Sequence, residues 1–262
     1  MCYYKENKEK ICTFKAFVDY YAPKYYLDCE EEVKDTRNSD INRSYRPFET
    51  LVSNLLCRDL SKSLQNEDIF RILAWKIGGY DHKQSKKERT DVYKEQWNES
   101  CLQVVLNKKT VNISEYAEWL RQKEKDILMK AEKDITKGLR LIRNPNGKAL
   151  KGIGDVYAIT LLYFISRGKY PIYDRFVFRA LYAIENNLKP GDIVTYEKWI
   201  QAIVETGPSK VGIYEKIYIE RLSKLNSELG NTDYKNRDLD RALWVYGHKF
   251  KVISAETYSF IC

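Results

Sequence analysis

Apolar residues along most of the chain recur every three or four positions, and polar residues fill the positions between them. This spacing is typical of an amphipathic α-helix, and no apolar/polar alternation of the kind expected for a strand extends beyond a few residues. The pattern predicts helices over residues 47–57, 66–76 (starting at Asn66 or Glu67), 112–143, 155–167, 175–187, 196–205, 212–228 and 239–250. A shorter helix is predicted before Pro23. We therefore expect an all-α fold.

Glycine, proline and asparagine mark where several of these helices end. Gly78 and Gly79 follow the second predicted helix, the sequence Asn-Pro-Asn-Gly at residues 144–147 follows the long third one, and Gly168 follows the fourth. Asn112, with Glu115 three residues later, has the spacing of a capping box and indicates the start of the long helix.

The composition is that of a globular protein with a basic surface. Of the 262 residues, 44% are hydrophobic and 31% are charged, which excludes a disordered chain. The length suits one large domain or two intertwined small ones. The formal net charge of +8 is compatible with a polyanionic partner without proving one. Residues 1–45 are expected to form an arm.

The cysteines and histidines exclude several kinds of metal site. The six cysteines are scattered without a CxxC pair, so neither a zinc ribbon nor an iron–sulfur loop is indicated. Two histidines, His82 and His248, are too few for a multi-histidine site. Scattered thiols, a polar N-terminal sequence and no long apolar run predict a cytoplasmic protein without membrane contact, nucleoid-associated if the source is bacterial.

A short glycine-containing turn separates two of the predicted helices. Gly152 and Gly154 flank Ile153, which could pack between the helices as an apolar plug. Glycine permits positive φ, and the N–H groups of such a turn and of the next helix start can bind phosphate. The alternative interpretation is an ordinary turn between helices.

Residues 150–179 resemble the helix-hairpin-helix DNA glycosylase superfamily, which includes endonuclease III and the adenine, 8-oxoguanine and 3-methyladenine glycosylases. The matching positions are Leu150, Gly152, Ile153, Gly154 and Ala158 in the hairpin, Asp174 at the family's aspartate, and Val177 and Arg179 after it. The resemblance implies that Lys151, Gly152, Ile153 and Gly154 bind DNA. The likeness is closest to the 8-oxoguanine glycosylase and endonuclease III-like branch without an iron–sulfur cluster.

The resemblance implies a catalytic role for Asp174. Cleavage of an N-glycosidic bond develops positive charge on the sugar, which a fixed carboxylate can stabilise. An Asp before a helix is also a favoured N-cap, and both roles are compatible. The position that carries the Schiff-base lysine in bifunctional relatives is Val156, so a monofunctional enzyme without lyase activity is expected. No cofactor is expected, although a monovalent cation could bind the hairpin carbonyls.

Three residues depart from the family pattern. Lys151 replaces the usual proline, and Tyr157 replaces a small hydroxyl residue. Asp155 places a negative charge beside the expected phosphate site, which is unfavourable unless Asp155 caps the helix.

Weaker similarities lie on either side of the hairpin. Residues 77–83 resemble a segment of the family's helical barrel, and Pro47–Cys57 resembles its first core helix. Arg58 follows at a position where relatives contact the DNA gap. In 8-oxoguanine glycosylases a late helix lines the base pocket, and here Asp240, Trp244 and His248 share one helix face. The alternative places Trp244 in the core and His248 at the surface.

These observations predict two helical subdomains with Asp174 at the cleft between them. Residues 1–57 would pack with 169–262, and residues 58–168 would form a helical barrel that ends in the hairpin. The expected function is excision of a modified base from double-stranded DNA by a monomeric glycosylase. Two alternatives remain, namely a non-catalytic helix-hairpin-helix DNA-binding protein and a helical interaction protein without a nucleic-acid role.

Overall fold

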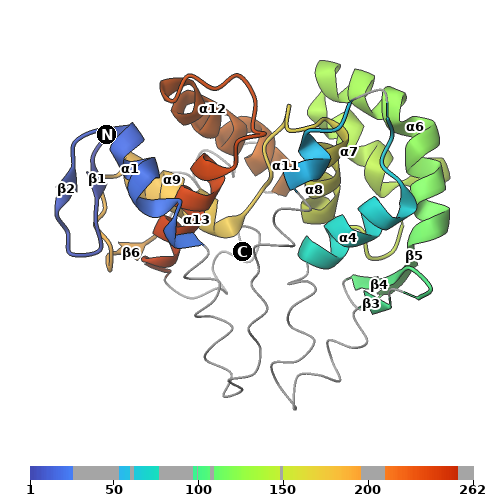
Figure 1. Cartoon of the computed structure of the whole chain (residues 1–262), viewed down its shortest axis with the longest axis horizontal. Coiled ribbons are helices and arrows are strands. Elements are labelled where there is room, and N and C mark those ends of the chain that lie inside the picture. Colours follow the sequence, from blue (N-terminus) through green and yellow to red (C-terminus); the bar gives the residue numbers. More distant parts are fainter. Residues whose placement is uncertain are drawn as a thin grey trace, which may run out of the picture. The chain divides into compact units, whose positions relative to one another are not determined.

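A computed structural model of the chain describes residues 1–25, 53–59, 62–76, 97–98, 100–106, 109–147, 150–195 and 210–252. The protein is mostly helical (Figure 1). Short strands of two to four residues form three small sheets and thereby qualify the all-α prediction. Within the described part of the chain, no helix combines the length and the apolar character needed to cross a membrane.

The chain divides into two compact units. One combines Met1–Asp28 with Tyr173–Cys262, and the other is the continuous segment Cys29–Ile172. The first is called the discontinuous unit here and the second the continuous unit. The chain passes from the continuous to the discontinuous unit between Ile172 and Tyr173, so Asp174 is the second residue after the boundary. The subdomain boundaries expected from the sequence, at residues 57 and 168, stay predictions.

The discontinuous unit is built on helices from both ends of the chain. Its elements are β1 (Tyr3–Tyr4), β2 (Lys10–Ile11), α1 (Phe14–Tyr21), α9 (Arg175–Glu185), β6 (Ile193–Val194), α11 (Lys210–Ile213), the π-helical segment η3 (Tyr214–Tyr218), α12 (Ile219–Glu228), α13 (Asp238–His248) and β7 (Lys251–Val252). β1 pairs with β2 in antiparallel fashion, and β6 pairs with β7 in parallel. Helix α13 packs against both α1 and α9 (Figure 1).

Aromatic side chains fill the contact between α1 and α13. The rings of Phe17 and Tyr246 meet edge to face with centroids 5.1 Å apart, and the Tyr21 ring lies 5.2 Å from that of Tyr246. All three side chains are fully buried. The segment expected to be an N-terminal arm thus supplies part of a packed core in its first 25 residues, because its apolar positions fall on one face of α1.

The contact between α9 and α13 depends on Gly247. A Cβ atom at this position would lie 1.9 Å from the carbonyl oxygen of Phe176, in the first turn of α9. Only a residue without a side chain allows this close approach of the two backbones. Gly247 therefore sets the position of the start of α9 against the end of α13.

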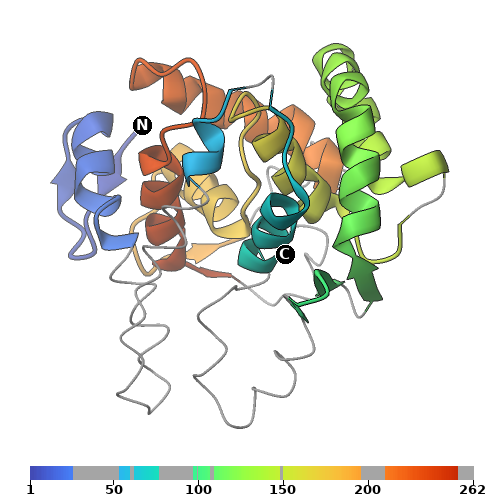
Figure 2. The same ribbon diagram turned by 45° about the vertical axis from the view of Figure 1, so that its right-hand side comes forward.

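The continuous unit consists of helices and one three-stranded sheet. Its elements are α4 (Asn66–Lys76), β3 (Trp97–Asn98), β4 (Gln103–Leu106), β5 (Lys109–Asn112), α6 (Ile113–Lys133), α7 (Ile135–Arg143), η2 (Pro145–Gly147) and α8 (Asp155–Ile165). The strands are antiparallel in the order β3-β4-β5. Helix α8 is buried from Ala158 to Ile165, as expected for a helix that is apolar on every face. It packs against α4 and α7, while α6 packs against the same two helices (Figure 2).

The single helix predicted over residues 112–143 is wrong, because the chain forms two helices there. Asp134 is extended, with φ −164° and ψ 108°, and its side chain caps α7 by accepting a hydrogen bond from the backbone N–H of Lys137. Gly138 then lets α7 pack closely on α6, since a Cβ there would lie 2.6 Å from the Cβ of Ala131. The prediction failed because Asp134, among so many lysines, looks like part of the solvated face of one long helix. Asp is also a favoured N-cap, which is its role here.

Most other predicted helices are confirmed. Helix α4 has the predicted bounds, and α8, α9 and α13 begin and end within two residues of theirs. Gly168 ends the α8 segment with φ +77°, and its N–H donates to the carbonyl oxygen of Tyr163. Residues 53–56 of the first predicted core helix are helical. Cys57 forms a turn, and residues 47–52, the predicted helix over 196–205 and the segment 77–83 lie outside the described residues.

Candidate functional site

Asp174 caps the N-terminus of α9. Its backbone is extended, with φ −140° and ψ 138°, and its Oδ1 accepts a hydrogen bond of 2.8 Å from the N–H of Phe176. This confirms the N-cap interpretation of Asp174. The side chain is only half-buried, so the cap holds a carboxylate at a defined place without enclosing it.

Three buried tyrosines form a cluster that includes the residue before Asp174. Tyr173, directly before it in the chain, has its ring 5.1 Å from that of Tyr218 and 6.4 Å from that of Tyr214. Tyr214 and Tyr218 are the first and last residues of η3 and are fully buried. Such π-helical segments are rare and often occur at functional sites.

The Tyr218 hydroxyl forms a hydrogen bond with the backbone of Asp174. Burial raises the pKa of Tyr218 well above its usual value, and the negative charges of Asp240 and Asp174 raise it further. A hydrogen bond with the backbone of Asp174 acts in the opposite direction and lowers this pKa. A bond that lowers the pKa of an acid is one donated to the oxygen, so the donor is the Asp174 N–H. Tyr218 therefore contacts the cap residue directly.

Two of the three residues expected in the base pocket lie together. The rings of Trp244 and His248 are 3.8 Å apart, and His248 also stacks on Phe176 with ring centroids 3.4 Å apart. His248 Nδ1 lies 2.8 Å from the carbonyl oxygen of Trp244. Both side chains are half-buried, which is intermediate between a core and a surface position. One face of His248 is thus covered by the first turn of α9.

Arginines surround the ring of Phe176. The guanidinium groups of Arg175 and Arg179 lie 4.8 and 5.0 Å from the ring centroid. Arg179 also donates to the carbonyl oxygen of Phe250 at 2.9 Å, whereas Arg175 is exposed. The candidate carboxylate is therefore followed directly by an exposed cation that rests on an aromatic ring.

Asp240, the third residue of the expected base pocket, has a different environment. It accepts a hydrogen bond of 2.9 Å from the guanidinium group of Arg237, which is 5% exposed. Its charge acts on the Tyr218 hydroxyl, as described above. Asp240 thus interacts electrostatically with Tyr218, and its role in base recognition stays a prediction.

In the continuous unit, the expected phosphate-binding turn connects α7 to α8. Gly152 has φ +106°, and a Cβ there would lie 2.9 Å from the carbonyl oxygen of Leu106 in β4. Gly154 has φ −85° and is the N-cap of α8, without a capping side chain. Ile153 is 3% exposed, as expected for an apolar plug. Gly152 is therefore required by its backbone conformation and by its packing on β4, while Gly154 caps α8 without a side-chain hydrogen bond.

An ion pair neutralises the charge of Asp155 beside this turn. Asp155 is the first residue of α8 and pairs with the guanidinium group of Arg143, at the end of α7. It does not cap the helix, since Gly154 holds that position. Lys151 is exposed at the turn. Val156, where bifunctional relatives carry a lysine, lies in the first turn of α8, and its carbonyl oxygen accepts from Thr160 Oγ1.

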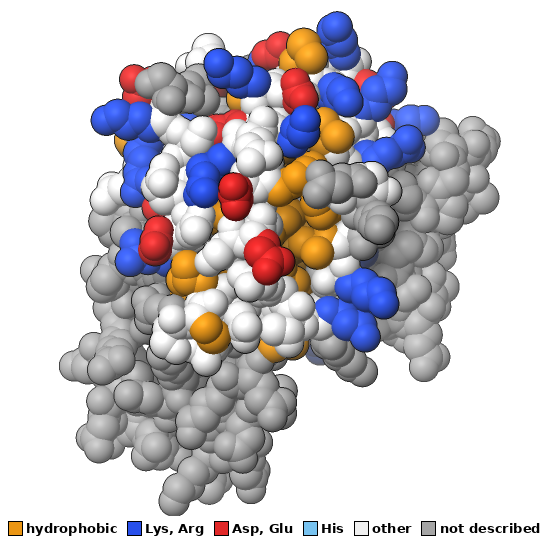
Figure 3. Space-filling view, turned by 90° about the vertical axis from the view of Figure 1, so that its right-hand side faces the viewer, with side chains coloured by type: hydrophobic (Ala, Val, Ile, Leu, Met, Phe, Trp, Pro, Cys, Tyr) orange, Lys and Arg blue, Asp and Glu red, His pale blue; other side chains and the backbone are white. Residues whose placement is uncertain are grey.

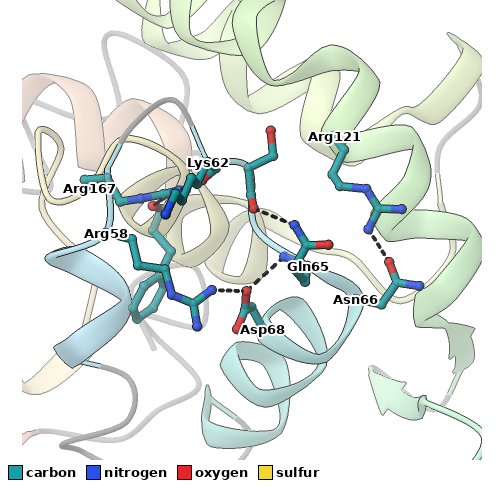
Figure 4. A network of polar contacts seen from close by, with 9 residues as sticks. Arg58, Lys62, Gln65, Asn66, Asp68, Arg121 and Arg167 are labelled. Atoms are coloured by element: carbon teal, nitrogen blue, oxygen red, sulfur yellow. Dashed lines mark hydrogen bonds and ion pairs between the residues drawn. The ribbon is translucent and has the colours of Figure 1, made fainter.

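Arg58 belongs to a polar network in the same unit (Figure 4). It forms an ion pair with the buried carboxylate of Asp68, which also accepts from the Gln65 N–H at 2.9 Å. Nearby, the buried Arg167 donates to the carbonyl oxygen of Lys62 at 2.6 Å, and burial lowers its pKa. Arg58 thus helps to hold the start of α4, and its DNA contact stays a prediction.

The face drawn in Figure 3 carries basic side chains without forming a uniform basic surface. Lys and Arg side chains spread along its edges, Asp and Glu side chains lie among them, and hydrophobic side chains gather near its centre. This is the side on which α6 and α7 are drawn in Figure 1. The described Lys and Arg side chains on this face are therefore interspersed with acidic ones.

Sequence reasoning missed Phe176 and Tyr218. Phe176 follows Asp174 by two residues, so its proximity could have been noticed, but its stacking on His248 joins positions 72 residues apart. Tyr218 lies in a predicted helix, where a π-helical segment leaves no trace in the apolar spacing.

No protein-family model, curated protein or solved structure matches the chain.

Proposed function

We propose that the protein is a monofunctional DNA glycosylase that hydrolyses the N-glycosidic bond of a flipped, modified base in duplex DNA. The observation that carries this proposal is the placement of Asp174, a half-buried carboxylate fixed as the N-cap of α9 and followed by an aromatic stack. Its spacing from the Gly152–Gly154 turn is the one that residues 150–179 share with the helix-hairpin-helix glycosylases.

In the proposed reaction the carboxylate acts on the sugar. Departure of the base leaves positive charge on the sugar ring, and Asp174 would stabilise that charge and orient the attacking water. The cap bond from Phe176 N–H holds the carboxylate in place before the substrate arrives, so little reorganisation is needed. Val156 offers no nucleophile, so the product would be an abasic site in an unbroken strand.

The turn before α8 would bind the DNA backbone. Gly154 leaves the N–H groups at the start of α8 without a capping side chain, and Lys151 is exposed beside them. The ion pair with Arg143 offsets the unfavourable charge of Asp155 at this place. A monovalent cation at the carbonyl groups of the turn is part of the proposal, and the chemistry itself needs no cofactor.

A panel of duplexes, each with one modified or mismatched base, tests the proposal. We expect at least one duplex to lose its base, with strand breakage only after alkali treatment. Breakage without alkali would contradict the monofunctional assignment. Duplex binding without release of any base would favour the alternative of a non-catalytic DNA-binding protein.

A salt series on the same duplexes tests the DNA partner itself. Affinity for DNA must fall steeply with salt, because phosphate contacts release counterions. Absent or salt-insensitive binding would favour a helical interaction protein without a nucleic-acid role.

A further inference from the structure

Tyr218 contacts Asp174 but has no part in the proposed reaction. Its side chain is fully buried, yet its hydroxyl is acted on by the charge of Asp174, the half-buried residue that caps α9. Burying a hydroxyl costs free energy unless the group is hydrogen-bonded. The partner of the Tyr218 hydroxyl is therefore important for the structure. That partner is the backbone of Asp174.

The π-helical segment places this hydroxyl. In η3 the backbone between α11 and α12 widens by one residue over Tyr214–Tyr218, which shifts the following side chains relative to a regular α-helix. The Tyr218 ring packs on Tyr173, the residue directly before Asp174. Ring packing and the hydrogen bond therefore both act on the two residues that lead into α9.

We propose that Tyr218 is a positioning residue, whose hydroxyl oxygen fixes the backbone of Asp174 so that the carboxylate is held in its cap geometry. Two hydrogen bonds connect Tyr218 to the first turn of α9. Tyr218 accepts from the Asp174 N–H, and Asp174 Oδ1 accepts from the Phe176 N–H. The catalytic part of this role rests on the proposed function, whereas the positioning part concerns the protein alone.

Asp240 and Tyr214 also act electrostatically on the hydroxyl. The charge of Asp240 acts on the Tyr218 hydroxyl, and Arg237 holds Asp240 through a hydrogen bond of 2.9 Å. The negative charges of Asp240 and Asp174 favour the neutral form of Tyr218, because they would repel a phenolate. Tyr218 therefore stays protonated and supplies an oxygen that accepts, without becoming a second anion beside Asp174.

Amide hydrogen exchange in the full-length protein tests the positioning directly. In the wild type we expect the Asp174 amide to be protected, because its N–H is bound to a buried oxygen. The variant Tyr218→Phe keeps the ring and removes the acceptor, so the Asp174 amide should exchange about three- to tenfold faster, as loss of one hydrogen bond implies. An unprotected Asp174 amide in the wild type would overturn the proposal without any variant.

Tyr246→Phe is the matched control. Tyr246 is also fully buried in the discontinuous unit, and its hydroxyl bonds to a backbone atom, the carbonyl oxygen of Leu188 at 3.3 Å. This variant should leave the exchange of the Asp174 amide unchanged. Equal acceleration of that amide in both variants would assign Tyr218 a general structural role and contradict the proposal.

Base release provides the second readout. On a duplex that the wild type processes, Tyr218→Phe should lower kcat about tenfold and change KM less than about twofold, because a displaced carboxylate affects the transition state rather than DNA binding. An unchanged kcat would overturn the catalytic part. If the wild type releases no base, the proposed function fails, and the exchange measurement alone decides the role of Tyr218.

Discussion

The carboxylate of Asp174 combines a structural and a proposed chemical task in one side chain. As an N-cap it satisfies the Phe176 N–H, a contribution of about 1 kcal/mol to stability. As a catalytic group it would need its negative charge, which capping does not require. Asparagine caps helices about as well as aspartate, so the two tasks can be separated by a single substitution.

Gly247 leads to a prediction about stability at the same site. In most helix interiors Gly→Ala stabilises by up to about 1 kcal/mol. At position 247 the new Cβ would lie 1.9 Å from the Phe176 carbonyl oxygen, so Gly247→Ala should instead destabilise by about 2 kcal/mol or more. Chemical denaturation measures the difference in the free energy of unfolding.

Gly230→Ala serves as the comparison for this variant. Gly230 has φ +74°, and a Cβ atom there would have no other heavy atom within 4 Å, so only backbone strain of about 1 kcal/mol is expected. A Gly247→Ala protein as stable as the wild type would show that α9 and α13 can separate without cost.

At the scale of elements, the turn between α7 and α8 combines a glycine conformation with an ion pair. Gly152 brings the turn onto β4, and Arg143 and Asp155 connect the two helices across it. If this turn binds phosphate, the charge of Asp155 opposes binding, and Arg143 is partly engaged in offsetting it.

Asp155→Asn should therefore tighten duplex binding about three- to tenfold at low salt. The substitution removes a negative charge and releases Arg143 toward the DNA, so the salt dependence of binding should also become steeper. Affinity measured across a salt series gives both quantities.

Asp126→Asn is the control for charge. Asp126 is exposed on α6, and its carboxylate lies 3.7 Å from Lys123 Nζ, so this variant also removes one charge and releases one cation. A similar gain in affinity from both variants would mean that net charge, not the turn, controls binding.

The helices of the continuous unit show what apolar spacing can and cannot predict. The bounds of α4 follow from its apolar face, and Gly168 marks the end of the α8 segment. Apolar spacing misses the break at Asp134, because a capping aspartate and a solvated aspartate look alike in a charged helix. It also misses the pairing of β4 with β5, because strands of four residues are too short for alternation to be recognised.

At the scale of the whole molecule, the chain order sets which residues share a unit. Residues 1–28 join 173–262, so Asp174, Tyr218 and the Trp244–His248 pair belong to one unit, and the Gly152 turn belongs to the other. The sequence pointed to Asp174 and to the turn because local motifs carry them. The contacts of Phe176 with His248 and of Tyr218 with Asp174 could not be predicted from the sequence, since they join distant segments and depend on tertiary packing.

The central claim is that Asp174 supplies a negative charge to the cleavage of a glycosidic bond. The most direct measurement compares the wild type with Asp174→Asn in single-turnover base release from the duplex that the wild type processes best. We predict that Asp174→Asn keeps its fold and binds the duplex within about threefold of the wild type, yet releases the base at least about 100-fold more slowly. Release of the base at the wild-type rate by Asp174→Asn would contradict the account.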